Sequence, residues 1–185
     1  MADRAFATCF ISGKEAVRIA GIALAYFGAL LHMLNNTLAK LVLFLTAGNI
    51  RSAYNTKIIR RVTGAIKVIP VSATLFILGV FAVTGWPPFG VFVSELTIVT
   101  AGFSAGNVLA SVLFIGFVAT VFIGFIYYAT GMVFGEPSRH YKEGESDVLS
   151  LIVIAVLVVF LLVLGTIMPA KIYHFIMRAA AVIQG

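Results

Sequence analysis

The sequence predicts an all-α fold: a polytopic transmembrane bundle of about five helices, one of them broken at a Pro-Pro pair, with an amphipathic surface helix at the C-terminus. Three observations lead to this prediction. Of the 185 residues, 61% are hydrophobic and only 11% are charged, whereas a soluble domain has about 25% charged residues. Several apolar stretches approach or exceed the roughly 20 residues that cross a bilayer. In lipid such stretches must be helical, because no water satisfies a bare backbone.

The first long apolar stretch covers residues 19–50 and follows an N-terminal segment, residues 1–18, that we expect to lie outside the membrane. The stretch is interrupted near its middle by Asn35-Asn36-Thr37 and by Lys40. We therefore expect one helix that is tilted or locally broken. A connector with five basic residues and no acid follows at 51–67.

Four further spans are expected at residues 68–85, 89–103, 108–134 and 148–168. The first of these should stop at Trp86-Pro87-Pro88, because a proline lacks an amide proton and clashes with the preceding turn. Counting five crossings puts the basic connector and the C-terminus on the same side of the membrane.

Two smaller elements complete the prediction. Segment 50–62, around Asn55-Thr56, is compatible with a small hairpin. Pro169 opens the last helix, residues 169–185, because proline is favoured at the first helical position. Its basic residues share one face and most of its apolar residues lie off that face, as in a helix that lies along the membrane surface.

Lys40 and Glu95 are the two charged residues that fall inside the expected spans. Even by low estimates, placing a charged residue at the centre of a membrane helix costs about 2.5–3.5 kcal/mol of free energy. Such residues are therefore interpreted as functional by default. The structural alternatives are a static ion pair that pins two helices, or a lysine whose ammonium group snorkels to the interface. Snorkelling is awkward for Lys40, which has apolar helix on both sides.

His32, Asn36 and Lys40 are spaced i, i+4, i+8, so they line one face of one helix. Taken alone, His32 is more typical of a satisfied interior histidine. In line with an amide and a lysine, it predicts a hydrogen-bonded path that conducts once water enters.

Glu95 follows Pro87, Pro88 and Gly90 by a turn or two, where helical hydrogen bonding should be disrupted. Broken helices place unpaired backbone groups and water at mid-membrane depth, where ion sites form in transporters. A carboxylate at such a break can hold or release a proton.

The sequence resembles a family of antiporter-like membrane subunits in two runs, GALLHMLNNTLAKLVLFLTAGNI and IPVSATLFILGVFAVTGWPPFGVFVSEL. These subunits are shared by NADH:quinone oxidoreductase, multi-subunit Na+/H+ antiporters and membrane-bound nickel-iron hydrogenases. Within the family it is most similar to hydrogenase-4 component F of formate hydrogenlyase-type complexes. The resemblance implies that Lys40 is the central relay of a polar axis, His32 its neighbour, and Glu95 the terminal proton carrier.

The sequence departs from this family in two ways. Several relatives have a second histidine at the position of Asn36, and an amide cannot titrate, so water must bridge there. Family members have about fourteen helices in two inverted halves, whereas this chain resembles the last five. We therefore expect residues 1–185 to be a single membrane domain that is a fragment, a split-gene product or a reduced accessory subunit.

The resemblance favours a subunit that contributes a proton-translocation half-channel to a redox-driven complex of the hydrogenase or NADH:quinone oxidoreductase type. Two alternatives stay open: a subunit of a multi-subunit Na+/H+ antiporter, and a non-conducting membrane scaffold. The expected location is the cell inner (cytoplasmic) membrane, with several passes. The expected partners are the lipid bilayer, protons or Na+, and other membrane subunits, including a missing N-terminal half or a homologous antiporter-like subunit.

Other functions are disfavoured by what the sequence lacks. It has no nucleotide loop and no nucleophile–base constellation, so we expect no catalytic centre of its own and no cofactor. A single cysteine, Cys9, excludes an internal disulfide and a cysteine-based metal cluster. The net charge of +6 comes from basic residues at the ends of the spans. It therefore gives no reason to expect nucleic-acid binding. We also expect no metal site.

Overall fold

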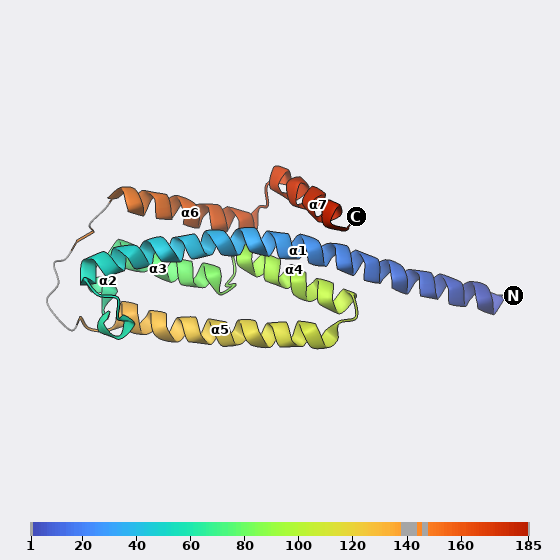
Figure 1. Ribbon diagram of the computed structural model, residues 1–185, viewed down its shortest axis with the longest axis horizontal. Helices are drawn as coiled ribbons and strands as arrows, with labels where there is room; N and C mark the ends of the chain where they lie inside the picture. Colours follow the sequence, from blue (N-terminus) through green and yellow to red (C-terminus); the bar gives the residue numbers. More distant parts are fainter. Residues whose placement is uncertain (1, 138–143, 146–147, 185) are drawn as a thin grey trace.

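The computed structural model describes residues 2–137, 144–145 and 148–184, and within these ranges every regular element is a helix. The helices form one elongated bundle in which α1 runs along the middle (Figure 1). The predicted fold class is confirmed, and the four later spans have their predicted bounds to within two residues. In chain order the helices are α1 (Ala2–Tyr54), η1 (Ile59–Arg61), α2 (Ala65–Val68), α3 (Pro70–Val83), α4 (Gly90–Ser104), α5 (Val108–Phe134), α6 (Val148–Thr166) and α7 (Ala170–Gln184).

Helix α1 is continuous from Ala2 to Tyr54, so the local break considered for the first span does not occur. Its central polar side chains form hydrogen bonds that leave the helix uninterrupted. Thr37 donates to the carbonyl of Met33, one turn back, at 2.7 Å, and Asn35 reaches across to α4. The helix also includes residues 2–18 of the expected extramembrane segment, and its N-terminal end projects beyond the other helices (Figure 1).

Helices α3 and α4 lie end to end along α1 and together run its length within the bundle (Figure 1). They have 14 and 15 residues, so each is only about 21–23 Å long, short of the roughly 30 Å hydrocarbon core. By length and composition the helices that can cross alone are α1, α5 and α6, and α3 and α4 are shorter apolar helices. The two half-helices therefore make one discontinuous span, broken between Val83 and Gly90.

This arrangement overturns the expectation that the basic connector and the C-terminal helix share a side. At the break the chain continues in the same direction instead of reversing, so one crossing fewer separates the two segments. The connector, with α2, lies at one end of the bundle and α7 lies towards the other (Figure 1).

The hairpin suggested for segment 50–62 is also wrong. Helix α1 continues to Tyr54 and so occupies the residues that a first strand would need. Asn55 then takes a left-handed conformation, with φ of 47°, which is a common way to end a helix. The connector is anchored by the Tyr54 hydroxyl, which donates to the carbonyl of Thr63 at 2.7 Å.

The bundle core lies where α1, α3, α4 and α6 meet. Helix α5 packs on the side of α3 and α4 away from α6 (Figure 1) and leaves most of its own surface exposed. Helix α7 rests on α1 through Ile176, which is buried in one cluster with Phe27 and Leu31. Its basic residues Lys171, His174 and Arg178 are exposed, as predicted for an amphipathic helix.

The N-terminus of α3 is capped by a side chain from the segment between α5 and α6. One carboxylate oxygen of Glu145 accepts from the backbone amides of Val71 and Ser72, at 2.8 and 2.9 Å. The other accepts from the Ser72 hydroxyl at 2.6 Å. Asn49 of α1 donates to Ser72 and accepts from Ser150 of α6, both at 3.2 Å. The carboxylate of Glu145 thus satisfies two helical N–H donors that would otherwise be unpaired.

Candidate functional site

The break between α3 and α4 is held from two sides. On one side Asn35 of α1 is fully buried, and its amide nitrogen donates to the carbonyl of Gly90 at 2.8 Å. On the other side Gly165 of α6 lies so close to the backbone of Pro88 and Phe89 that an added Cβ would collide with it. The break is therefore a fixed feature of the bundle, built against two neighbouring helices.

We expect Gly165→Ala to destabilise the protein by about 1–3 kcal/mol, because overpacking against rigid backbone forces a shift of α6 or of the break. The measurement is thermal unfolding of the purified protein in mild detergent. Gly116→Ala on α5 is the matched control, since a Cβ added there meets no described atom within 4 Å apart from the adjacent backbone of its own helix. Equal melting temperatures for the two variants would show that the contact of α6 with the break is not tight.

The predicted polar face of α1 points towards α4 and α5. The His32 Nδ1 atom lies 3.1 Å from the hydroxyl oxygen of Ser94, and that hydroxyl donates its own proton to the carbonyl of Val91 at 2.7 Å. The Ser94 oxygen is thus left to accept from Nδ1–H. In the neutral imidazole, this arrangement leaves Nε2 free as an acceptor.

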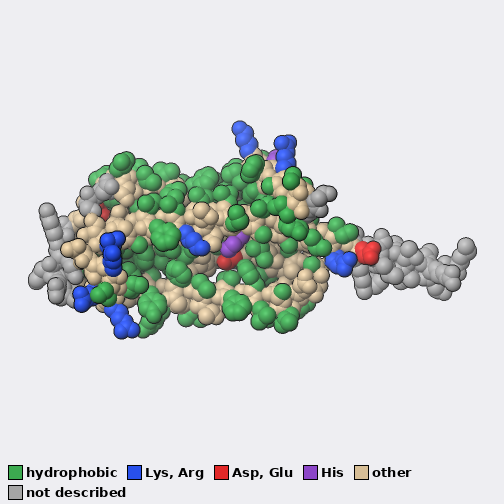
Figure 2. Space-filling view, in the orientation of Figure 1, with side chains coloured by type: hydrophobic (Ala, Val, Ile, Leu, Met, Phe, Trp, Pro, Cys, Tyr) green, Lys and Arg blue, Asp and Glu red, His purple; other side chains and the backbone are tan. Residues whose placement is uncertain are grey.

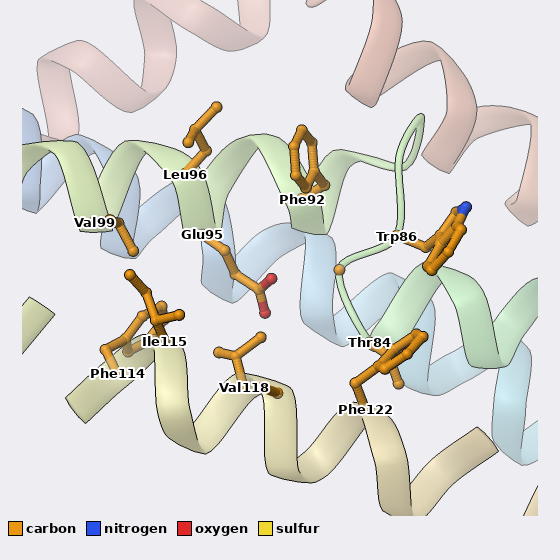
Figure 3. Close-up of a pocket in the computed structure, with 12 residues that line it drawn as sticks. Thr84, Trp86, Phe92, Glu95, Leu96, Val99, Phe114, Ile115, Val118 and Phe122 are labelled. Atoms are coloured by element: carbon orange, nitrogen blue, oxygen red, sulfur yellow. The ribbon is translucent and has the colours of Figure 1, made fainter. Parts of the chain in front are cut away.

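Glu95 leaves α4 just after the break and points towards α5, with its carboxylate facing Val118 (Figure 3). It also lies against Gly85, where an added Cβ would collide with the carboxylate. Gly85 has φ of 69°, so both its backbone conformation and the nearness of Glu95 require glycine there. The carboxylate is half-buried and has no hydrogen-bond partner among the residues that the structure describes.

Two adjoining cavities meet at Glu95. One, of about 370 Å³, is almost wholly apolar and is lined by Trp86 and residues of α4 and α5 (Figure 3). The other, of about 290 Å³, is lined by His32, Asn36 and Lys40 of α1 together with Glu95. The second cavity has room for several water molecules, and it offers them the polar partners that a buried water needs.

All four predicted path residues therefore line one cavity. The predicted break residues do not line it: Pro87, Pro88 and Gly90 form the turn that places Glu95 beside it. Within the described ranges no acid lies at ion-pair distance from Lys40, which is exposed. The arrangement can hold a proton at a carboxylate or an imidazole and pass it through water to an amine, which is what a proton path requires.

Sequence reasoning missed the importance of Asn35 and Ser94. It assigned the path role to Asn36, and the neighbouring Asn35 proves to be the buried amide that holds the break. No role was predicted for Ser94, and it is the partner of His32. Its position directly before Glu95 was the available signal, since residues next to a site often orient it. The hydroxyls of Thr97 and Thr100 bond to carbonyls of their own helix instead.

A family model described as "NADH:quinone oxidoreductase/Mrp antiporter, TM" matches residues 16–123. The chain is 30% identical over 166 residues to a hydrogenase-4 component F homolog of Methylacidiphilum infernorum, covering 89% of this chain and 34% of that one. It is 29% identical over 157 residues to Na(+)/H(+) antiporter subunit A1 of Staphylococcus aureus, covering 77% and 20%. The chain thus spans about a third or less of the length of these curated relatives.

Its fold is similar to a chain in the solved structure of the Mrp complex from a Dietzia species. The TM-score is 0.75 at 21% sequence identity, covering 86% of this chain and 38% of that one. At this level of identity the likeness shows the fold alone. With the apolar helices, the matches identify a multi-pass protein of the cytoplasmic (inner) membrane.

Proposed function

The chain belongs to the NADH:quinone oxidoreductase/Mrp antiporter transmembrane family, and on that premise we propose that it contributes a proton-translocation half-channel to a redox-driven membrane complex. One observation carries the proposal. Lys40 and Glu95 lie within two different spans, yet they line the same cavity, with His32 and Asn36 beside them. Charged residues inside membrane helices are costly, and where they share a water-sized cavity they mark ion pathways.

The residues divide the work by their chemistry. Glu95 can take up or release a proton, because its carboxylate is free of hydrogen bonds among the described residues and meets both cavities. His32 has one ring nitrogen engaged by Ser94 and can exchange a proton at the other. Lys40 accepts and returns a proton at the far end of the same cavity. Asn36 cannot titrate, so it orients the water that links His32 to Lys40.

The helix break supplies the remaining condition. Between Val83 and Gly90 the backbone leaves the regular helical pattern, and irregular backbone at membrane depth is tolerated where it lines a cavity. Asn35 and Gly165 keep the break in place, so Glu95 is presented at a fixed depth. Proton transfer through water requires this constancy of distance, because donor and acceptor must lie within hydrogen-bond reach of the same waters.

A second candidate is a subunit of a cation/proton antiporter with no redox partner. The similarity to a Na(+)/H(+) antiporter subunit favours it. The same cavity would serve, with Na+ moved in exchange for protons. In inverted membrane vesicles an electron donor alone should acidify the interior if the complex is redox-driven. An antiporter should instead need an imposed gradient and should respond to Na+.

We expect the purified chain, reconstituted alone in liposomes, to conduct no protons above the background of empty liposomes. The described residues supply one lysine and one glutamate to a single cavity, and relatives are about three times as long or longer. The measurement is the fluorescence of an enclosed pH indicator after a pH jump. The complex extracted from native membranes in mild detergent is the control. Robust flux from the chain alone would show that the path is complete within it.

A further inference from the structure

An open groove runs along α5, and we call it the α5 groove. It consists of four adjoining cavities, each sharing lining residues with the next. The two at Glu95 share Val118, and the next, of about 440 Å³, shares Val121 and Phe125 with the cavity of Lys40. The last, of about 480 Å³, shares Tyr128 and reaches the basic connector. Figure 2 shows hollows between α5 and the rest of the molecule along this line.

Apolar side chains that the described chain leaves uncovered lie along this groove and on the neighbouring face of α1. On α5, Phe117 and Val121 are 70% and 51% exposed. On α1, Met33 and Phe44 are 69% and 75% exposed and flank Lys40 at i−7 and i+4, so the three share one helical face. This stretch of α1 is about 16 Å long, enough to contact two to three turns of another helix.

The charge of Lys40 decides what can cover this surface. Lys40 lies at the middle of an apolar helix, so the phosphate of a lipid does not reach it, and an acyl chain cannot offset its charge. A second copy of this chain would bring two such lysines together. Glu95 lines the same cavity, but within the described ranges it forms no ion pair with Lys40. Another membrane helix that carries a carboxylate would cover the exposed apolar side chains and also neutralise the charge of Lys40.

We propose that this face, formed by α1 and the α5 groove, receives a transmembrane helix of a partner subunit that carries an Asp or Glu at the depth of Lys40. The inference rests on the proposed function in assuming that the chain works beside other membrane subunits. It goes further in naming the surface and the chemistry of the partner. In lipid such a helix associates through van der Waals packing and through interhelical polar contacts.

The first test separates docking from proton transfer by using two substitutions of one residue. Lys40→Arg keeps the positive charge, so it should assemble like the wild type. Lys40→Met removes the charge, so it should lower the assembled fraction about five- to thirtyfold, the range expected for one interhelical polar contact in a membrane. The readout is the distribution of the chain on native gels of mild-detergent extracts. Normal assembly of Lys40→Met would contradict the proposal of an acidic partner helix. If that assembled variant had also lost proton movement, the proposed function would still hold.

The second test identifies the occupant by cross-linking in native membranes. Phe44→Cys, in a Cys9→Ser background, is labelled with a photoactivatable maleimide reagent, and the adducts are sequenced by mass spectrometry. We expect a peptide from an apolar helix with an Asp or Glu within about one turn of the level of Lys40. Val156→Cys, 62% exposed, is the matched control and should label phospholipid, because it belongs to α6, a helix on the opposite side of α1 from α5 (Figure 1).

Three outcomes of this cross-linking would overturn the proposal: adducts with phospholipid only, with a second copy of this chain, or with a helix that has no acid near that depth. Where the acid is found, exchanging the two charges completes the test. Lys40→Asp alone should not assemble. Combining it with a lysine in place of the partner's acid should restore assembly to within about threefold of the wild type, because the exchanged pair has a slightly different geometry. Failure of the exchange to restore assembly would also count against the pair.

Discussion

Glu95→Gln should reduce the proton movement that depends on this chain to background, while the protein still inserts and assembles. Glutamine has almost the shape of a protonated glutamate, so it keeps the packing against Gly85 and Val118. It cannot release a proton, and among the described residues Glu95 is the carboxylate that lines the cavity of Lys40. The measurement is proton uptake by inverted vesicles that contain the whole complex, driven by its own electron donor.

Glu95→Asp is the conservative comparison for this prediction. It keeps a titratable carboxylate but withdraws it by one methylene from the meeting point of the two cavities, so we expect reduced but measurable transport. Native gels must show equal assembly for both variants. An assembled Glu95→Gln complex with full proton uptake would remove Glu95 from the path and reduce its role to one of packing.

Lys40→Ala and Lys40→Arg should both stop transport, for different reasons. Alanine removes the amine that receives the proton at the end of the cavity, and it also removes the charge that we propose binds the partner helix, so its assembly is measured as well. Arginine keeps the charge, but a guanidinium group does not give up its proton in proteins, so it can occupy the position without relaying. The two variants are compared in the same vesicle assay as Glu95→Gln. Retained transport in the arginine variant would mean that Lys40 acts only as a fixed positive charge.

The sequence was sufficient for the apolar spans and for the polar path, for clear physical reasons. A long apolar stretch in lipid must be helical, because its backbone groups have no water to bond to. The bounds of α5 and α6 could therefore be predicted closely. The spacing of His32, Asn36 and Lys40 fixes them to one face of any helix. The structure then brings these residues and Glu95 to one cavity.

The sequence was not sufficient where a choice depends on neighbouring helices. A proline pair shows where a helix stops, but not whether the chain then reverses, so the end-to-end arrangement of α3 and α4 could not be predicted. Asn35 and Asn36 are adjacent and chemically identical. Only the position of α4 decides that Asn35 is buried against Gly90 while Asn36 faces the cavity. The importance of Gly165 could not be predicted from the sequence, because it depends on contact with the backbone of the helix break, about 75 positions earlier in the chain.

The cap on α3 has a consequence for how the protein is made. Glu145 satisfies the amides of Val71 and Ser72, but it lies 74 and 73 positions later in the chain. During synthesis α3 therefore leaves the ribosome long before its N-terminus can be capped, and α5 must be made in between. We expect the α3–α4 span to remain loosely seated at the translocon until α5 and the segment after it have emerged. The final bonds among Glu145, Ser72, Asn49 and Ser150 would then fasten the early and late helices in one step.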